Sequence, residues 1–247
     1  ANYYKAECEY FNNKQSEAVK SYQFVVDQST NEYTEKSLIR LTSYYVKQND
    51  CENANKYFAM LEPVASSKNT FIDAIMGAMR CSYKLKDYDK AKQKAIQLLP
   101  IENVPKENLV EANMVLGRIQ LKDNNLRTAK SHFDYVISES RNELTAEALF
   151  QRATIYYQQT DLDAARTDVL KLNDDYSAYE IWVVKGFILL SDIYLAEKDC
   201  FQAKATLQSI IDNYNKEDDG LLDICRMKLK EIDKLENSKK AKAIKEE

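Results

Sequence analysis

The stretches DCENANKYF (residues 50–58) and DCFQAKATL (residues 199–207) share one pattern. In both, an Asp-Cys pair is followed three residues after the cysteine by an alanine, Ala54 or Ala203. Apolar residues follow each alanine four and seven positions later, and this spacing places three side chains on one stripe of an α-helix. The two stretches are therefore either halves of a split metal or redox site or two copies of one structural unit.

The alanine recurs along the chain, which favours the second interpretation. Its six copies are spaced by 36 to 38 residues, at Ala18, Ala54, Ala91, Ala129, Ala165 and Ala203. A second helical stripe precedes each alanine, and an Asp or Asn beside the intervening turn can cap the helix that follows it. Small residues mark the expected helix crossing at Ala6, Thr42, Gly117, Ala153 and Ser191, with Met79 as the exception. The pattern predicts repeated pairs of amphipathic helices.

Composition restricts the fold and the partners further. The 247 residues include only four Gly and three Pro, so we expect few turns with a positive φ and an all-helical chain with short connections. Lys and Arg number 35 against 39 Asp and Glu, which argues against nucleic acid as a partner. The longest apolar run, IWVVKGFILL from Ile181, contains Lys185 and is too short for a transmembrane segment.

These features resemble the tetratricopeptide repeat (TPR) family, whose unit is a helix-turn-helix of 34 residues. The resemblance rests on turns such as KDYDKA and EKDCFQA and on the Ala–aromatic–aliphatic stripe. It implies an all-α fold, a right-handed α-α superhelix (a TPR-like solenoid) of about six helix-turn-helix units plus a C-terminal capping helix. The expected single domain covers 1–236, with units at 1–31, 32–68, 69–105, 106–142, 143–177 and 178–216, a cap at 219–236 and a flexible charged tail at 237–247.

The five cysteines and the single histidine give no sign of chemistry. Cys51 and Cys200 occupy equivalent places four units apart, too far for a shared metal or a disulfide. Without a CxxC motif, and with His132 alone, a zinc site lacks ligands, so the cysteines are expected to act as small apolar residues. No glycine-rich phosphate loop, GxSxG or HExxH is present. We therefore expect no catalytic, metal or cofactor-binding residues and no enzyme activity.

The face of the first helices is the expected binding surface, because solenoids of this kind bind partners in a concave groove. Apolar and basic side chains alternate there, which predicts a protein or peptide partner with apolar anchors and acidic flanks. The predicted groove comprises Ile39, Ser43, Val46, Lys47, Met76, Arg80, Tyr83, Lys84, Met114, Arg118, Leu121, Lys122, Phe150 and Tyr157. The competing interpretation is that the apolar residues pack between neighbouring helices and the basic ones are simply solvated.

A second candidate surface lies on the helix that starts near Tyr179, which is apolar on nearly every side. Such a helix is buried, either against the final helix or against a partner subunit. The candidate assembly residues are Trp182, Val183, Ile188 and Leu189. Self-assembly is therefore the alternative to peptide binding, and the oligomeric state is left open.

The two ends of the chain carry separate expectations. Helical patterning begins at Asn2 without a capping residue, which predicts that preceding repeats cover Tyr3, Tyr4, Tyr10 and Phe11. Stretches such as LKLNDDYSAY (residues 170–179) are similar to TPR proteins of the bacterial envelope, including outer-membrane assembly lipoproteins. That similarity implies a periplasmic or outer-membrane-associated scaffold, and a cytoplasmic adaptor is the rival, since the number of cysteines is odd.

Overall fold

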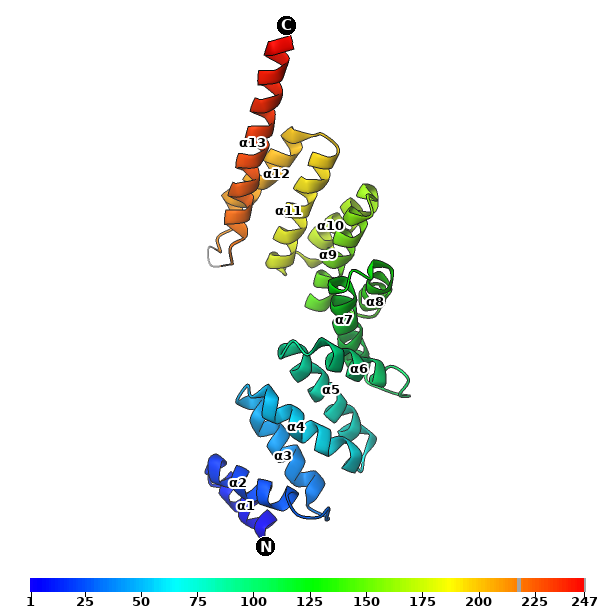
Figure 1. Cartoon of the computed structure of the whole chain (residues 1–247), viewed down its shortest axis with the longest axis vertical. Helices are drawn as coiled ribbons and strands as arrows, with labels where there is room; N and C mark the ends of the chain where they lie inside the picture. Colours follow the sequence, from blue (N-terminus) through cyan, green and yellow to red (C-terminus); the bar gives the residue numbers. More distant parts are fainter. Residues whose placement is uncertain (217–218, 247) are drawn as a thin grey trace. The chain divides into compact units, whose positions relative to one another are not determined.

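The computed structural model of the chain describes residues 1–216 and 219–246, with side chains as far as residue 237. It consists of two compact units, residues 1–125 and 126–247, and each is described by itself (Figure 1). The repeat pattern predicts one domain over 1–236, whereas the division falls inside the predicted unit 106–142. In a repeat protein each helix contacts mainly its sequence neighbours, so compact groups of helices can form within one array.

Unit 1 contains the first seven α-helices. Its helices are α1 (Asn2–Phe11), α2 (Gln15–Val26), α3 (Thr34–Lys47), α4 (Cys51–Leu61), α5 (Lys68–Lys84), α6 (Tyr88–Leu98) and α7 (Lys106–Lys122), with a short 3-10 helix, η1 (Glu62–Val64), after α4. Each helix packs against the next one in the chain, and α5 also contacts α7. The predicted helix pairs of the first three units are therefore confirmed.

Unit 2 continues the alternation of helices. Its helices are α8 (Leu126–Glu139), α9 (Glu143–Gln158), α10 (Leu162–Tyr176), α11 (Glu180–Ala196), α12 (Cys200–Asn213) and α13 (Leu221–Glu246). The capping helix α13 packs on α12 and α11 and extends beyond the predicted end at residue 236. Lys, Ala and Glu dominate residues 239–246 and are strong helix formers, which accounts for the longer helix over most of the predicted flexible tail. Glu247 lies outside the described residues. All regular elements in the described ranges are helical, so the all-α class is confirmed.

A left-handed residue makes each turn within a helix pair. The residues with positive φ in these turns are Asn13, Asn49, Lys86, Asn124, Thr160 and Lys198. The next residue donates its backbone N–H to a carbonyl five residues earlier, as Asp50 does to Tyr45 at 2.9 Å, which closes a Schellman motif. The expectation that few turns need positive φ is therefore wrong. Asn tolerates this conformation best among residues with a side chain, and the repeat uses it, with Lys and Thr, in place of Gly.

Aspartate then starts the second helix, as the turn sequences predict. The side chains of Asp50, Asp87, Asp161 and Asp199 accept hydrogen bonds from the backbone N–H three residues later. Each cap satisfies one of the donors that a helix N-terminus leaves without a partner inside the helix. The same turn geometry therefore both ends one helix and starts the next.

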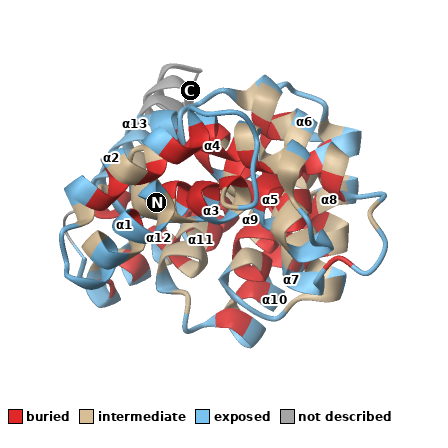
Figure 2. Ribbon diagram, turned by 90° about the horizontal axis from the view of Figure 1, so that it is seen from below, coloured by how far each residue is buried: buried red, intermediate tan, exposed pale blue. Residues whose placement is uncertain are grey.

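The repeated alanines are buried between packed helices. Ala54, Ala91, Ala129, Ala165 and Ala203 have no exposed surface, and Ala18 is 1% exposed. Buried positions lie on the inward faces of the helices, whereas the connecting turns are largely exposed (Figure 2). Gly77 of α5 marks an even closer approach, because a Cβ atom built there would lie 2.1 Å from the Phe58 ring of α4.

The apolar helix α11 owes its composition to its neighbours inside unit 2. It packs against α9, α10, α12 and α13, so several of its faces meet other helices. Val184, Leu190 and Ile193 are buried in this environment. Of the two alternatives that the sequence leaves open, the final helix or a partner subunit, α11 contacts the final helix α13.

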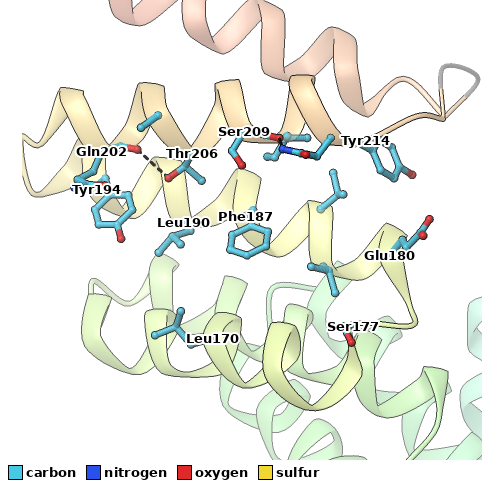
Figure 3. Close-up of a pocket in the computed structure, with 15 residues that line it drawn as sticks. Leu170, Ser177, Glu180, Phe187, Leu190, Tyr194, Gln202, Thr206, Ser209 and Tyr214 are labelled. Carbon is cyan, nitrogen blue, oxygen red and sulfur yellow. Dashed lines mark hydrogen bonds between the residues drawn. The ribbon is translucent and has the colours of Figure 1, made fainter.

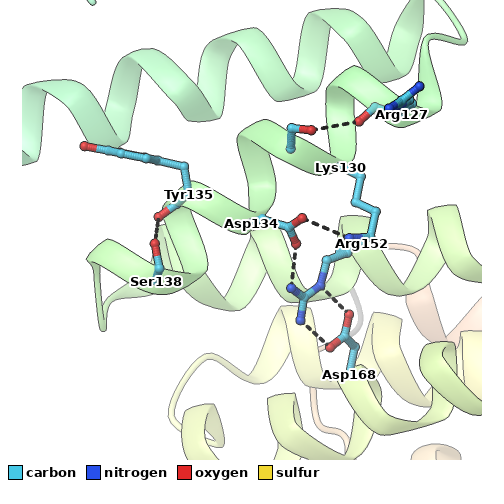
Figure 4. A network of polar contacts seen from close by, with 8 residues as sticks. Arg127, Lys130, Asp134, Tyr135, Ser138, Arg152 and Asp168 are labelled. Carbon is cyan, nitrogen blue, oxygen red and sulfur yellow. Dashed lines mark hydrogen bonds and ion pairs between the residues drawn. The ribbon is translucent and has the colours of Figure 1, made fainter.

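An ionic network joins three helices of unit 2 (Figure 4). Arg152 of α9 donates two hydrogen bonds of 2.7 Å to the carboxylate of Asp168 on α10 and one of 2.7 Å to Asp134 on α8. Lys130 also donates to Asp134, at 2.9 Å. Asp168 is 4% exposed, so the Arg152 guanidinium compensates the charge of this carboxylate away from water.

The close approach at Gly77 gives a first prediction. Gly77→Ala improves helix propensity by about 1 kcal/mol but forces the Phe58 ring to move, with an overpacking cost of about 1–3 kcal/mol. We expect a net loss of stability in urea unfolding. In a Phe58→Leu background the smaller side chain removes the clash, and Gly77→Ala becomes neutral or stabilising. An equal loss in both backgrounds would contradict the proposed contact.

The buried ion pair gives a second prediction. Asp168→Ala leaves the Arg152 guanidinium without its two-bond partner and lowers the free energy of unfolding by about 3–5 kcal/mol. The matched control is Asp175→Ala on the same helix, which removes an exposed ion pair with Lys171 at 3.9 Å. This control should lower the free energy of unfolding by less than about 0.5 kcal/mol. Chemical denaturation measures both, and similar losses would refute the structural role of Asp168.

The Asp134 carboxylate makes the stability of the fold depend on pH. Burial raises the pKa of Asp134, but hydrogen bonds from Arg152 and Lys130 together with their charges outweigh it and lower the pKa below 3.8. A lowered pKa stabilises the fold above about pH 4, and this contribution disappears as the pH falls through the folded-state value. Wild type should therefore exceed Asp134→Asn in unfolding midpoint at pH 7, and the difference should shrink at pH 3. A difference that is constant with pH would exclude the effect.

Candidate functional site

The predicted binding surface lies mostly on α3, α5 and α7 of unit 1. We call the exposed and partly exposed predicted residues of these helices the first-helix surface, which comprises Ile39, Ser43, Val46, Lys47, Arg80, Tyr83, Lys84, Arg118, Leu121 and Lys122. Ile39 and Val46 are 41% and 48% exposed, although both are apolar. This surface therefore presents apolar groups to solvent beside lysines.

Two contacts fix the spacing of these helices. Arg80 of α5 donates two hydrogen bonds of 2.6 Å to the carboxylate of Glu111 on α7. Lys84 at the end of α5 donates to the side-chain oxygen of Asn49, in the turn after α3. These contacts connect α5 to α7 and the end of α5 to the turn after α3.

The surface shows a repeated pair of residues at the helix ends. Each of the three helices ends in an apolar residue followed by lysine: Val46-Lys47, Tyr83-Lys84 and Leu121-Lys122. The three lysines are exposed. A cation in the last helical turn interacts favourably with the C-terminal end of the helix dipole, so each lysine also stabilises its helix.

Cation–π contacts accompany the basic groups. The Arg118 guanidinium carbon lies 5.7 Å from the centre of the Tyr83 ring, and the Lys122 ammonium lies 4.7 Å from that of Tyr88. Arg80 is different, because Glu111 neutralises its charge. The hydrogen bonding of Arg80 to the Glu111 carboxylate is the main cause of the raised pKa of Arg80. Attraction of an acidic partner therefore depends more on the lysines than on Arg80.

Two predicted groove residues do not face solvent. Met76 is 2% exposed and Met114 is fully buried, since both fill space between helices. The prediction that they form an accessible apolar floor is wrong, and the competing interpretation of packing between helices holds for them. Phe150 and Tyr157 belong to α9 in unit 2, so the structure does not place them in the surface of unit 1.

The start of unit 1 contains a polar and aromatic cluster that the sequence did not reveal. Arg40 of α3 donates to both carboxylate oxygens of Glu7 on α1, at 3.0 and 3.1 Å, and lies 4.3 Å from the Tyr10 ring centre. Tyr22 donates a hydrogen bond to the same carboxylate. Burial raises the pKa of Glu7, but the bonds from Arg40 and Tyr22 outweigh it and lower the value. The only sequence signal was the opposite charge at residues one repeat apart.

The candidate assembly residues are largely used inside unit 2. Ile188 and Leu189 are 9% and 7% exposed, so the prediction of an accessible assembly surface is wrong for them. Trp182 packs against Phe150 with ring centres 5.9 Å apart, and the Lys185 ammonium lies 4.3 Å from its ring centre. Val183 retains partial exposure. The apolar character of α11 therefore serves packing within the chain.

A groove of about 620 Å³ opens between α10 and α12 over α11 (Figure 3). Val183, Val184, Phe187 and Leu190 supply apolar side chains from α11, and Leu170 contributes from α10 with 45% of its surface exposed. The lining residues of α12 are mostly polar and uncharged: Gln202, Ala205, Thr206, Ser209, Ile210 and Asn213. Two of these side chains form hydrogen bonds within α12. The Thr206 hydroxyl donates to the backbone carbonyl of Gln202, and the Asn213 amide donates to that of Ser209.

Sequence reasoning missed this groove because it searched the first helices for a binding face, whereas second helices form its walls. The polar residues of α12 at positions 202, 206, 209 and 213 follow helical spacing and could have indicated a solvent-facing wall. The groove can accept an apolar, uncharged surface. Glu180 is the charged residue in its lining and already pairs with Lys216 at 3.0 Å.

Within residues 1–216 and 219–246, no group of three His, Cys, Asp or Glu side chains lies close enough to hold a metal ion. Burial lowers the pKa of His132, which is therefore neutral at pH 7. Of the cysteines, Cys51, Cys81 and Cys225 are buried, in line with their predicted role as small apolar residues. No helix in the described part of the chain has both the length and the apolar character to cross a bilayer.

Comparison with known proteins gives similarity at the level of structure. No protein-family model matches the sequence, and no curated protein matches it either. YrrB, described as a TPR protein with an unusual peptide-binding site, is 19% identical and superposes over 78% of this chain and 92% of its own with a TM-score of 0.58. PilF of Pseudomonas aeruginosa is 12% identical and superposes over 92% of this chain and 96% of its own with a TM-score of 0.59.

A third solved structure is PH0952 of Pyrococcus horikoshii, a signal transduction ATPase of the STAND class with a tetratricopeptide repeat sensor. It is 16% identical, with a TM-score of 0.68 over 95% of this chain and 38% of its own. At identities this low, the similarity shows a shared fold and does not extend to function or to site residues. The helix pairs, their turns and these superpositions agree, and the chain has the tetratricopeptide repeat fold.

Proposed function

We propose that this chain is a non-enzymatic scaffold that binds a segment of a partner protein on the first-helix surface of unit 1. The observation that carries the proposal is the apolar–lysine pair repeated at the ends of α3, α5 and α7. Three equivalent positions in successive repeats present an apolar contact and a positive charge in the same order. A partner with alternating apolar and acidic residues would match that order along its length.

Exposure supports this role for the apolar members of the pairs. Val46 is 48% exposed and Ile39, two turns earlier on α3, is 41% exposed, while Tyr83 and Leu121 are partly exposed. Covering such groups removes apolar area from water and contributes about 25 cal/mol per Å² before the costs of association. The lysines add long-range attraction and orientation more than affinity.

The fold comparison is consistent with this proposal. YrrB is described as having a peptide-binding site, and it shares the fold of this chain. For this chain, peptide binding rests on the surface residues themselves. The envelope location implied by the resemblance stays a prediction beside the proposed function, with a cytoplasmic adaptor as its rival.

Self-assembly through α11 is less well supported. Ile188 and Leu189 are buried within unit 2, and the Trp182 ring is covered on one side by Phe150 and on another by Lys185. Trp182 and Val183 alone give a small exposed area. The first-helix surface therefore offers the better case for partner binding.

Charge reversal on this surface tests the proposal. The triple variant Lys47→Glu, Lys84→Glu, Lys122→Glu should bind acidic–apolar peptides at least about tenfold more weakly than wild type. The measurement is binding to an array of synthetic extended peptides in which acidic and apolar residues are varied independently. Wild-type binding should also weaken between 0.05 and 0.5 M salt, roughly, because salt screens exposed charges.

A matched control separates this surface from net charge. The variant Lys20→Glu, Lys56→Glu, Lys92→Glu carries the same charge change on the second helices α2, α4 and α6. It should retain wild-type binding, and circular dichroism should show unchanged helicity for both triple variants. Equal binding by all three proteins, or equal loss in both variants, would reject the first-helix surface as the site.

A further inference from the structure

Two cysteines lie where α4 and α5 pack against each other in unit 1. The pairing of these helices is antiparallel, and three contacts define it. The Phe58 ring of α4 lies against Gly77 of α5, and the Asn55 amide donates to the Ser82 hydroxyl at 3.2 Å. Beyond the start of α4, Lys84 donates to Asn49. Residues of rising number on one helix thus meet residues of falling number on the other.

Helical spacing places the cysteines on the facing stripes. Cys51 is four residues before Asn55, so it occupies the same face of α4 one turn earlier. Cys81 is four residues after Gly77 and next to Ser82, so it occupies the face of α5 that meets α4. The contact between Asn55 and Ser82 on one side and that between Asn49 and Lys84 on the other enclose the two thiols.

Burial and electrostatics agree with this placement. Cys51 and Cys81 are 8% and 4% exposed and belong to one apolar cluster together with Ala54, Ala74 and Ala78. Burial, followed by a hydrogen bond with the Cys51 thiol, raises the pKa of Cys81 to about 12. Both thiols therefore lie in the same buried contact between α4 and α5, and the alanines around them allow the helices to approach closely.

We propose that Cys51 and Cys81 are a redox-sensitive pair that forms an intramolecular disulfide between α4 and α5. The oxidant is a small-molecule disulfide, for example oxidised glutathione. This inference stands apart from the proposed peptide binding, since it depends only on the helix contact inside unit 1.

The reaction proceeds by two thiol–disulfide exchanges. The Cys51 thiolate attacks one sulfur of the oxidant, which forms a mixed disulfide and releases one small thiolate. The Cys81 sulfur then loses its proton and attacks the Cys51 sulfur, which releases the second small thiol. Two protein thiols and one small disulfide become one protein disulfide and two small thiols. Cys51 attacks first because the raised pKa keeps Cys81 protonated at neutral pH.

The disulfide would connect two repeats. Cys51 begins the second helix of the repeat 32–68, and Cys81 lies in the first helix of the next repeat. The crosslink closes a loop of about 30 residues and restricts the unfolded chain. It also fixes the end of α5 that carries Lys84 of the first-helix surface, so oxidation state and the geometry of that surface are linked.

The test is oxidation of the folded 247-residue chain with oxidised glutathione, followed by proteolysis and mass spectrometry without reductant. We expect a crosslinked peptide pair that contains Cys51 and Cys81, with a mass lower by two hydrogen atoms. In the variant Cys8→Ser, Cys200→Ser, Cys225→Ala, both remaining thiols should disappear in a thiol titration. The thermal midpoint should rise by roughly 5–10 °C, and a reductant should reverse the rise.

Single variants provide the controls. Cys51→Ser keeps Cys81 and should show neither the crosslink nor the thermal shift, while circular dichroism confirms its helices. A lasting glutathione adduct on Cys51 in the wild type would overturn the proposal, because the second exchange would then have failed. The proposal also fails if both thiols stay unreacted in the folded chain under conditions that oxidise them after unfolding in urea.

Discussion

The structure depends on the crossing between the two helices of each repeat. The repeated alanines, of which Ala54 and Ala203 are completely buried, are small enough to let the two helices approach closely. With the backbones close together, the flanking aromatic and aliphatic residues reach across and fill the space between helices. The fully buried Phe133, four residues after Ala129, illustrates this second layer. Gly77 extends the same principle to the contact between repeats, where the Phe58 ring occupies the place of a missing side chain.

The turn that produces the crossing is built from backbone geometry more than from glycine. A left-handed residue ends the first helix, and the aspartate after it caps the second, as at Asn49 and Asp50. The carbonyl five residues before this aspartate accepts its N–H, so the turn satisfies groups at both helix ends. Because Asn, Lys and Thr fill the left-handed position, the chain needs few glycines. The low glycine content therefore correctly predicted an all-helical chain. It wrongly predicted that few turns have a positive φ.

Charged residues divide into those that hold repeats together and those that face solvent. Arg40 with Glu7 and Arg80 with Glu111 join successive first helices, and Lys228 with Asp192 joins the capping helix α13 to α11, at separations of 31 to 36 residues. Arg152 connects three helices through two carboxylates, one of them buried. The lysines that end α3, α5 and α7 are exposed, and this difference makes them the stronger candidates for contact with a partner. Arginine forms the two-bond pairs because its planar guanidinium matches a carboxylate.

The sequence by itself determined the helix pairs, their period, the capping aspartates and the buried alanines, because each follows from local spacing along a helix. The first-helix surface stays a prediction from the sequence, which rests on equivalent positions in successive repeats. Only the tertiary structure decided that Met76 and Met114 are buried and that Arg80 forms an ion pair with Glu111. It also decided that Ile188 and Leu189 pack inside unit 2. These outcomes depend on which neighbouring helix meets each face. The proposed pairing of Cys51 with Cys81 also could not be read from the sequence. Comparison of equivalent positions relates Cys51 to Cys200, whereas helix packing places Cys51 against the next repeat.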